Sequence, residues 1–198
     1  MLTFNEDTHK YYWNGLNVPG VNEILSTSGI SNYNKIPIYL RESALYFGKY
    51  IHKMTELFDL NDLDFDSIKD VVIDGKRPVE YLEGWIKYKE LFKPIFQSIE
   101  KPLYSKIYNY AGTHDRVEDI TVDDIKTGIN SKSGDDLQLA AYLQLWNENY
   151  PDKKIKERRV IKLKPKEFEI APCKNKQDFN DFRICLSIHS LRKKRGLL

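Results

Sequence analysis

The sequence predicts an α/β protein in which helices flank a central mixed β-sheet and a small β-hairpin precedes it. Three observations favour this class. The chain opens with short strand-like segments around the dipeptide Asn14-Gly15, which is typical of a tight hairpin turn. Helical periodicity follows and then changes to strand-like segments between residues 95 and 126. From Asp135 the helical pattern returns, and two more strand-like segments precede a last helix.

The first half of the chain is expected to hold short strands and then helices. The strands are expected at residues 2–4, 10–13 and 16–18, followed by a short helix from residue 21. Proline is tolerated in a first helical turn, so Pro37 begins a second helix that runs to about Phe58 with a break near Gly48. Residues 59–76 are interpreted as an acidic loop or a short helix, and Pro78 begins the next helix.

The second half is expected to supply the sheet. Its strands are predicted at residues 95–100, 105–114, 118–126, 157–163 and 167–171. One helix is predicted over 135–150, between the third and fourth of these strands, and another over 176–194 at the end of the chain. A helix, a run of strands, a helix and further strands together predict the mixed sheet.

Length and composition bound the class of protein. The 198 residues correspond to one domain, predicted to span 1–198, and 41% hydrophobic with 30% charged residues is ordinary for a globular protein. No apolar run is long enough to span a bilayer, and the N-terminus lacks the apolar region of a signal peptide. We therefore expect a cytoplasmic protein with no membrane partner. Cys173 and Cys185 are expected to be reduced thiols, too few for a four-thiolate zinc or iron–sulfur site.

Charge is distributed unevenly along the chain. Residues 151–198 hold 15 Lys and Arg against 6 Asp and Glu, a net charge of +9, whereas residues 1–150 carry −7. A basic segment of this kind favours a polyanionic partner such as nucleic acid, although a solvated helix face explains most such runs.

Four local patterns place polar side chains on common faces. His52 and Glu56 are four residues apart in a predicted helix, as are Gln138 and Tyr142 in a later one. Asp115 ends the segment Ala111-Gly-Thr-His-Asp115, and Asp124 and Lys126 are two residues apart on the next predicted strand, which places them on one face. Each pattern alone is more often a solvated ion pair or an ordinary half-buried helix face than a functional site.

Taken together, these residues can perform metal-assisted phosphodiester chemistry. If residues 105–126 form a hairpin, the carboxylates of Asp115 and Asp124 can converge on one Mg²⁺ or Mn²⁺ ion. His52 would add a nitrogen ligand, which suits Mn²⁺ at least as well as Mg²⁺. Such an ion lowers the pKa of a bound water, and Lys126 could orient that water or stabilise the transition state.

The order of these patterns resembles the RecB-like branch of the PD-(D/E)XK nuclease superfamily, and the opening Val18–Leu25 resembles small phage and mitochondrial genome-maintenance exonucleases of that branch. The resemblance rests on Gly48-x₃-His52-x₃-Glu56, Gly112-Thr-His-Asp115, Asp124-Ile-Lys126-Thr-Gly128 and Gln138-x₃-Tyr142. It implies a restriction-endonuclease-like core, with metal bound at His52, Asp115, Asp124 and the Ile125 carbonyl. It also implies a catalytic lysine at Lys126.

The resemblance carries further expectations. Glu56 joins the catalytic candidates, Glu100 corresponds to a glutamate on the strand before Asp115, and Gln138 and Tyr142 contact the DNA strand. Many members bind an iron–sulfur cluster through four cysteines, and this chain, with two, departs from that pattern. The expected activity is a Mg²⁺- or Mn²⁺-dependent deoxyribonuclease, an exonuclease on single strands or duplex ends in DNA replication, recombination or repair.

Two other functions stay open on the same residues. One is a structure-specific or site-specific endonuclease, and the other is a nucleic-acid-binding module without turnover. The setting expected from the resemblance is a bacterial or phage-infected cell. A replication or recombination protein as partner and a ring-shaped oligomer are compatible with it.

Overall fold

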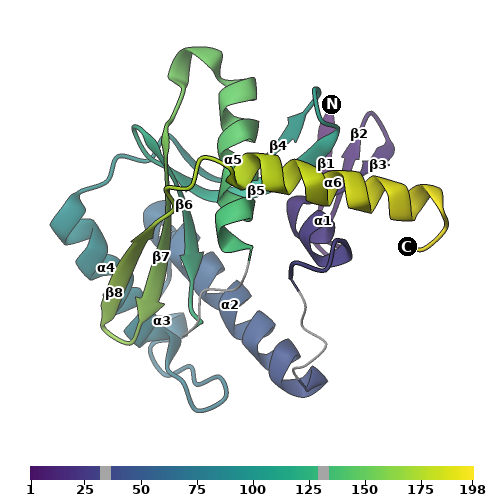
Figure 1. Ribbon diagram of the computed structural model, residues 1–198. Coiled ribbons are helices and arrows are strands. Elements are labelled where there is room, and N and C mark those ends of the chain that lie inside the picture. The colour runs from purple at the N-terminus through teal and green to yellow at the C-terminus, as the bar shows by residue number, and fades with distance from the viewer. Residues whose placement is uncertain (32–36, 129–133) are drawn as a thin grey trace.

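The protein is built on a five-stranded mixed β-sheet with helices on both faces and a separate three-stranded sheet at its N-terminus, as the computed structural model shows (Figure 1). The structure describes residues 1–31, 37–128 and 134–198. The strands of the large sheet are β4 (Ser98–Ser105), β5 (Tyr110–Val117), β6 (Thr121–Lys126), β7 (Glu157–Lys164) and β8 (Glu167–Pro172). They lie in chain order, and only β6 and β7 are parallel. The predicted α/β class with a mixed sheet is confirmed.

The small sheet is an antiparallel meander. Its strands are β1 (Leu2–Asn5), β2 (Lys10–Trp13) and β3 (Leu16–Val18). Asn14 and Gly15 both have positive φ values, 50° and 80°, as the predicted hairpin turn requires. Tyr11 of β2 packs on Ala111 of β5, so the meander leans on the large sheet next to the site described below.

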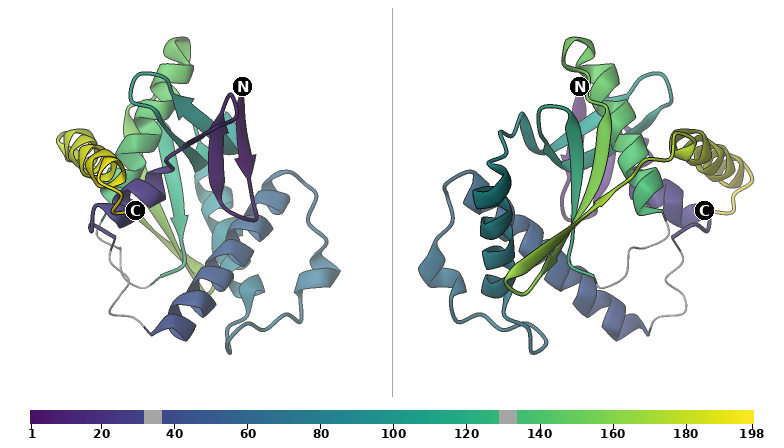
Figure 2. Two further views of the ribbon diagram at one scale, coloured as in Figure 1. Left: turned by 90° about the vertical axis from the view of Figure 1, so that its right-hand side faces the viewer. Right: turned by 60° about the vertical axis from the view of Figure 1, so that its left-hand side comes forward.

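Helices divide the core between the two faces of the sheet (Figure 2). The helices are α1 (Val21–Thr27), α2 (Ile38–Asp59), α3 (Phe65–Ile68), α4 (Pro78–Phe92), α5 (Asp135–Asn149) and α6 (Asp178–Lys194), with a short 3₁₀ helix at Pro151–Lys153. Val122 and Val160 pack with α1, α5 and α6, whereas Ile125 and Ile161 pack with α2 and α4. No helix in the described ranges is long and apolar enough to cross a membrane.

Several predicted element boundaries were wrong. The strands predicted at 95–100, 105–114 and 118–126 each begin later than expected, at Ser98–Ser105, Tyr110–Val117 and Thr121–Lys126, and the turn between the first two lies at 106–109. Pro102 lies inside the first of these strands, where it is tolerated because β4 is an edge strand of the sheet. The helix break expected near Gly48 is also absent, since α2 is continuous from Ile38 to Asp59. Packing of Phe47 and Ile51 in the core outweighs the roughly 1 kcal/mol that a helical glycine costs.

Candidate active site

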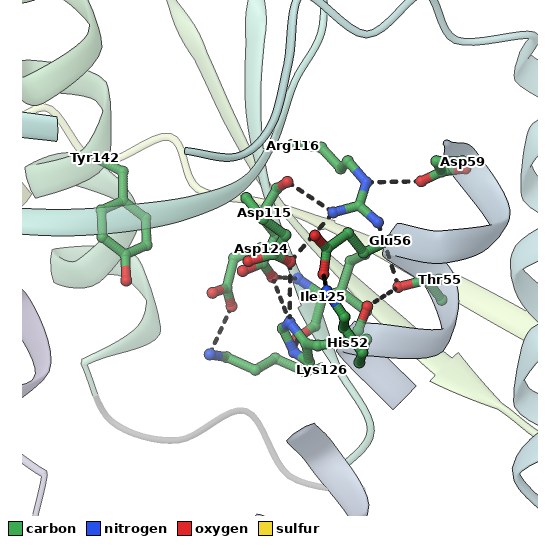
Figure 3. A network of polar contacts seen from close by, with 12 residues as sticks. His52, Thr55, Glu56, Asp59, Asp115, Arg116, Asp124, Ile125, Lys126 and Tyr142 are labelled. Carbon is green, nitrogen blue, oxygen red and sulfur yellow. Dashed lines mark hydrogen bonds and ion pairs between the residues drawn. The ribbon is translucent and has the colours of Figure 1, made fainter. Parts of the chain in front are cut away.

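The candidate site lies where β5 and β6 diverge. Among the described residues, the ladder between these strands consists of two pairs, Arg116 with Asp123 and Val117 with Val122. Beyond them the carboxylate of Asp115 enters the gap, and its Oδ2 accepts a hydrogen bond of 2.6 Å from the Ile125 amide. A side chain therefore replaces backbone pairing at this point, and the opening leaves room for α2 to approach (Figure 3).

His52 of α2 is fixed in this opening by the backbone of β6. Its Nε2 lies 2.8 Å from the Ile125 carbonyl oxygen, and because a carbonyl can only accept, Nε2 carries the proton. The other ring nitrogen, Nδ1, lies 3.5 Å from Asp115 Oδ2 and 3.6 Å from Glu100 Oε1. Burial lowers the pKa of His52. The charges of Asp115 and Glu100 raise it by more, so the pKa lies well above its usual value.

Three side chains from three elements can hold one cation. One ligand atom each from His52, Glu100 and Asp115 lies within 4.8 Å of the others. A metal-binding histidine usually donates its second ring N–H to a carbonyl or carboxylate, as Nε2 does here, which directs Nδ1 toward the metal. One nitrogen and two carboxylates form a donor set that fits Mg²⁺ or Mn²⁺. Metal binding would displace the proton that the carboxylates favour on His52.

Glu100 reaches the site from an unusual backbone conformation. It has φ of 43° in the middle of β4, between two residues that pair regularly with β5. Such a left-handed conformation costs a residue other than glycine about 1–3 kcal/mol and persists only where its surroundings stabilise it. Burial and the charge of Asp115 raise the pKa of its carboxyl, and His52 and Arg116 oppose this rise. No pattern in the sequence predicts this conformation.

Arg116 connects the elements that carry the three candidate ligands. Its buried guanidinium donates to Asp59 Oδ2 through Nε at 2.7 Å and to Glu100 Oε1 through Nη1 at 3.2 Å. Nη1 also donates to the Asp115 carbonyl, and Nη2 donates to Thr55 Oγ1. One guanidinium therefore ties α2, β4 and β5 together (Figure 3). Sequence analysis missed this role, although Arg116 directly follows Asp115.

Asp124 lies beside the three-residue group and faces Lys126. Lys126 Nζ lies 2.7 Å from the buried Asp124 Oδ2, and the two groups form an ion pair. Burial raises the pKa of Asp124 to about 7, against the attraction of Lys126. Burial lowers the pKa of Lys126. The charges of Asp124 and the other nearby carboxylates raise it by more, so the ammonium stays charged. Of the three side chains expected to converge, Asp115 and His52 come together, and Asp124 lies beside them.

Gln138 and Tyr142 of α5 extend the polar chain that starts at Lys126. Lys126 Nζ donates to Gln138 Oε1 at 3.1 Å, and Gln138 Nε2 donates to the Tyr142 hydroxyl at 2.9 Å. Both α5 side chains are buried. A Cβ atom at Gly112 would lie 2.7 Å from the ring of Tyr142, so the glycine of the motif makes room for this tyrosine. The DNA contact expected of both residues stays a prediction.

Two other candidates lie at the edge of the site. Glu56 forms an ion pair with Lys53 at 2.8 Å and does not belong to the group around His52. The Ile125 carbonyl accepts the hydrogen bond from His52. A catalytic role for Glu56 and metal binding by the Ile125 carbonyl remain predictions.

Comparison with known proteins adds a likeness of fold. No family model matches the sequence, and no curated protein matches it. A solved structure from Eubacterium rectale, named "Putative exonuclease", superimposes with a TM-score of 0.53 at 12% identity, over 77% of this chain and 69% of that one. A weaker likeness, with a TM-score of 0.40 at 7% identity, is to LHK-Exo in complex with dAMP, over 90% and 93% of the two chains. The chain therefore shares the fold of the first of these proteins.

Proposed function

We propose that the protein is a metal-dependent deoxyribonuclease of the RecB-like PD-(D/E)XK type, acting as an exonuclease on single strands or duplex ends. The observation that carries this proposal is the group of His52, Glu100 and Asp115 beside the Lys126–Asp124 ion pair. Two carboxylates and an imidazole around one point, next to a charged lysine, have the chemistry that phosphodiester hydrolysis needs. The likeness of fold to a protein named as an exonuclease agrees with this assignment.

The mechanism follows from what each side chain can do. His52, Glu100 and Asp115 would hold Mg²⁺ or Mn²⁺, with Asp124 beside them. When bound, such an ion would supply Lewis acidity toward the scissile phosphate and a water of lowered pKa. Lys126 stays charged because Asp124 and Asp135 surround it, so its ammonium can orient the attacking water and offset charge in the transition state. Gln138 holds this ammonium from the α5 side.

The substrate contacts follow from α5 and the basic C-terminal quarter. Gln138 and Tyr142 lie one helical turn apart beside Lys126, close to where the nucleotide next to the scissile phosphate would lie. Lys and Arg of residues 151–198 would contact the phosphate backbone, which predicts affinity that falls steeply with salt. A cytoplasmic role in DNA replication, recombination or repair, alone, as an oligomer or with a recombination protein, is part of the same proposal.

Cleavage of labelled DNA with Mg²⁺, with Mn²⁺ and with EDTA tests the chemistry. Asp115→Asn, Asp124→Asn and His52→Ala should each lower turnover in both metals, and calorimetry should show weaker metal binding, with the metal preference shifted in His52→Ala. Asp66→Asn, a change at an exposed carboxylate far from the site in sequence, is the matched control and should behave like wild type. Unchanged metal affinity in all three site variants would contradict the assignment.

The choice between exonuclease and endonuclease depends on how DNA reaches the site. Linear single strands should be degraded while covalently closed circles of the same sequence survive. Rapid cutting of closed circles would favour the endonuclease alternative. Binding without cleavage in either metal would favour the module without turnover.

A further inference from the structure

Helix α6 carries two apolar stripes, and one of them is exposed. The helix packs on α1 and α5 through the buried side chains of Phe182 and Cys185. On another face of the helix, Ile184, Ile188 and Leu191 are 60%, 39% and 56% exposed. Figure 2 shows α6 at the outer edge of the molecule in both views. The second stripe therefore faces solvent in a single copy of the protein.

The exposed stripe has the spacing of a contact between two helices. Ile184, Ile188 and Leu191 are separated by four and then three residues, and the same alternation reaches Asp181 before them and Arg195 after them. Side chains at alternating intervals of three and four form the contact line of two helices that cross at a small angle. Single exposed apolar side chains are ordinary on a protein surface, but three in one line with this spacing indicate a partner helix.

The two ends of this line carry opposite charges. Asp181 lies in the first turn of α6, and Arg195 is its C-cap residue. Both side chains are exposed, and neither has an ion-pair partner among the described residues. Residues 192–194, in the last turn, are basic as well. A partner helix is therefore favoured if it brings a basic end to Asp181 and an acidic end to Arg195.

A second copy of α6 that runs in the opposite direction meets these requirements. With Ile188 of the two copies at the centre, Ile184 of each copy lies opposite Leu191 of the other. Asp181 of each copy then lies opposite Arg195 of the other, so opposite charges meet at both ends. A parallel pair would instead place like charges against each other at both ends, which is unfavourable.

We propose that the protein forms a two-fold symmetric dimer through antiparallel pairing of the exposed stripes of two α6 helices. The same patch is used on both copies, so the assembly closes at two copies and does not extend to a ring or a filament. The helix has 17 residues, which makes it about 25 Å long. An interface of this length lies at the small end of specific interfaces, below about 1,200 Å² in total, so the pair is weak and depends on concentration. The proposal uses none of the candidate active-site residues and does not rest on the proposed function.

Sedimentation velocity of the full chain over a series of concentrations tests the pairing. The wild type should change from one copy to two as the concentration rises, with no larger species. Ile188→Glu places two carboxylates against each other at the centre of the interface and should weaken association about 10-fold or more. Ile95→Glu makes the same change at an isoleucine that is 73% exposed and lies outside α6, so it should leave association unchanged.

Charge reversal distinguishes the antiparallel pair from any other use of the stripe. Asp181→Arg and Arg195→Asp should each weaken self-association about 10-fold, because each variant brings like charges together at both ends of the pair. An equal mixture of the two variants should associate like the wild type, since opposite charges then meet again at both ends. A circular dichroism spectrum equal to that of the wild type shows that each variant is folded.

Three results would overturn the proposal. One is a wild type that stays monomeric at every concentration, which would leave the stripe to another protein or to nucleic acid. Another is an Ile188→Glu variant that associates as well as the wild type. The third is a mixture of Asp181→Arg and Arg195→Asp that associates no better than either variant alone.

Discussion

Two neighbouring aspartates of β6 face opposite sides of the sheet and differ in how they are paired. Asp123 faces α4, where both its oxygens accept hydrogen bonds of 2.8 Å from Arg159. Asp124 faces α5, where a single ammonium, that of Lys126, lies 2.7 Å from its buried Oδ2. Burial raises the pKa of each to about 7.

Burial and a shifted pKa therefore do not by themselves mark a functional carboxylate. The rigid fork of the Arg159 guanidinium matches both oxygens of Asp123 and holds them in a bidentate pair. The ammonium of Lys126 is a point charge on a flexible stem, so Asp124 can change partners when an ion or substrate arrives. The Asp123 pair is therefore a bidentate ion pair within the sheet, whereas the Asp124 pair fits the role that we propose for it in the active site.

The largest expected effect is a loss of DNA cleavage when the Asp124–Lys126 pair, and not the Asp123–Arg159 pair, is changed. Lys126→Ala should lower DNA cleavage by about 10²–10⁴, the usual contribution of a proton-transfer or charge-stabilising group, because no other side chain replaces its ammonium. Metal affinity, measured by calorimetry, should change little. Lys69→Ala is the control, since Lys69 forms an exposed ion pair with Asp66, outside both the site and the basic C-terminal quarter. Cleavage at the wild-type rate in Lys126→Ala would remove the mechanism.

The opposite result is expected on the α4 side. Arg159→Met leaves the Asp123 carboxylate buried without its partner, so the free energy of unfolding in urea should fall by about 3–5 kcal/mol. Metal affinity of the folded protein should be retained, because Arg159 contacts Asp123, Glu118 and Tyr88 rather than the group around His52. If metal affinity fell in parallel with stability, the two sides of β6 would not be independent.

Two histidines near Asp115 extend the comparison to pH. The pKa of His52 is raised, whereas burial lowers the pKa of His114 to about 4. The pKa of histidine in an unfolded chain is about 6.5. Below this pH, His114 binds a proton when the protein is unfolded but not when it is folded. Stability should therefore fall by about 3 kcal/mol as the pH decreases from 6.5 through 4. Urea unfolding across this range should give a smaller decrease in His114→Gln, and an identical decrease would contradict the assignment.

The smallest expected effect tests whether the guanidinium of Arg116 positions the metal group. Arg116→Lys keeps a charge but cannot contact Asp59, Glu100 and the Asp115 carbonyl at once. Metal affinity should fall about 10–100-fold, the usual cost of losing a residue that orients metal ligands. The line broadening in the electron paramagnetic resonance spectrum of Mn²⁺ on binding should also change, because Glu100 would lose support for its left-handed backbone conformation. Metal affinity equal to wild type would leave Arg116 a purely structural residue.

Sequence alone determined the class of fold and the local pairs. Helical and strand periodicity, turn residues and proline positions are local properties, so the order of elements and the mixed sheet could be predicted from them. Spacing of four in a helix and two in a strand likewise placed Gln138 with Tyr142 and Asp124 with Lys126, and the structure joins both pairs. The predicted break at Gly48 failed because core contacts outweigh a local preference.

Only the tertiary structure decided how the site is assembled. The divergence of β5 and β6, the left-handed backbone of Glu100 and the contacts of Arg116 each depend on residues far apart in the chain. The local sequence places Lys126 on the face of Asp124, but it does not show that Asp123 pairs with Arg159, which is 36 residues away in the chain. The difference between the two aspartates arises because Asp123 pairs on one face with Arg159 of the neighbouring strand β7, whereas Asp124 pairs on the other face with Lys126 of its own strand.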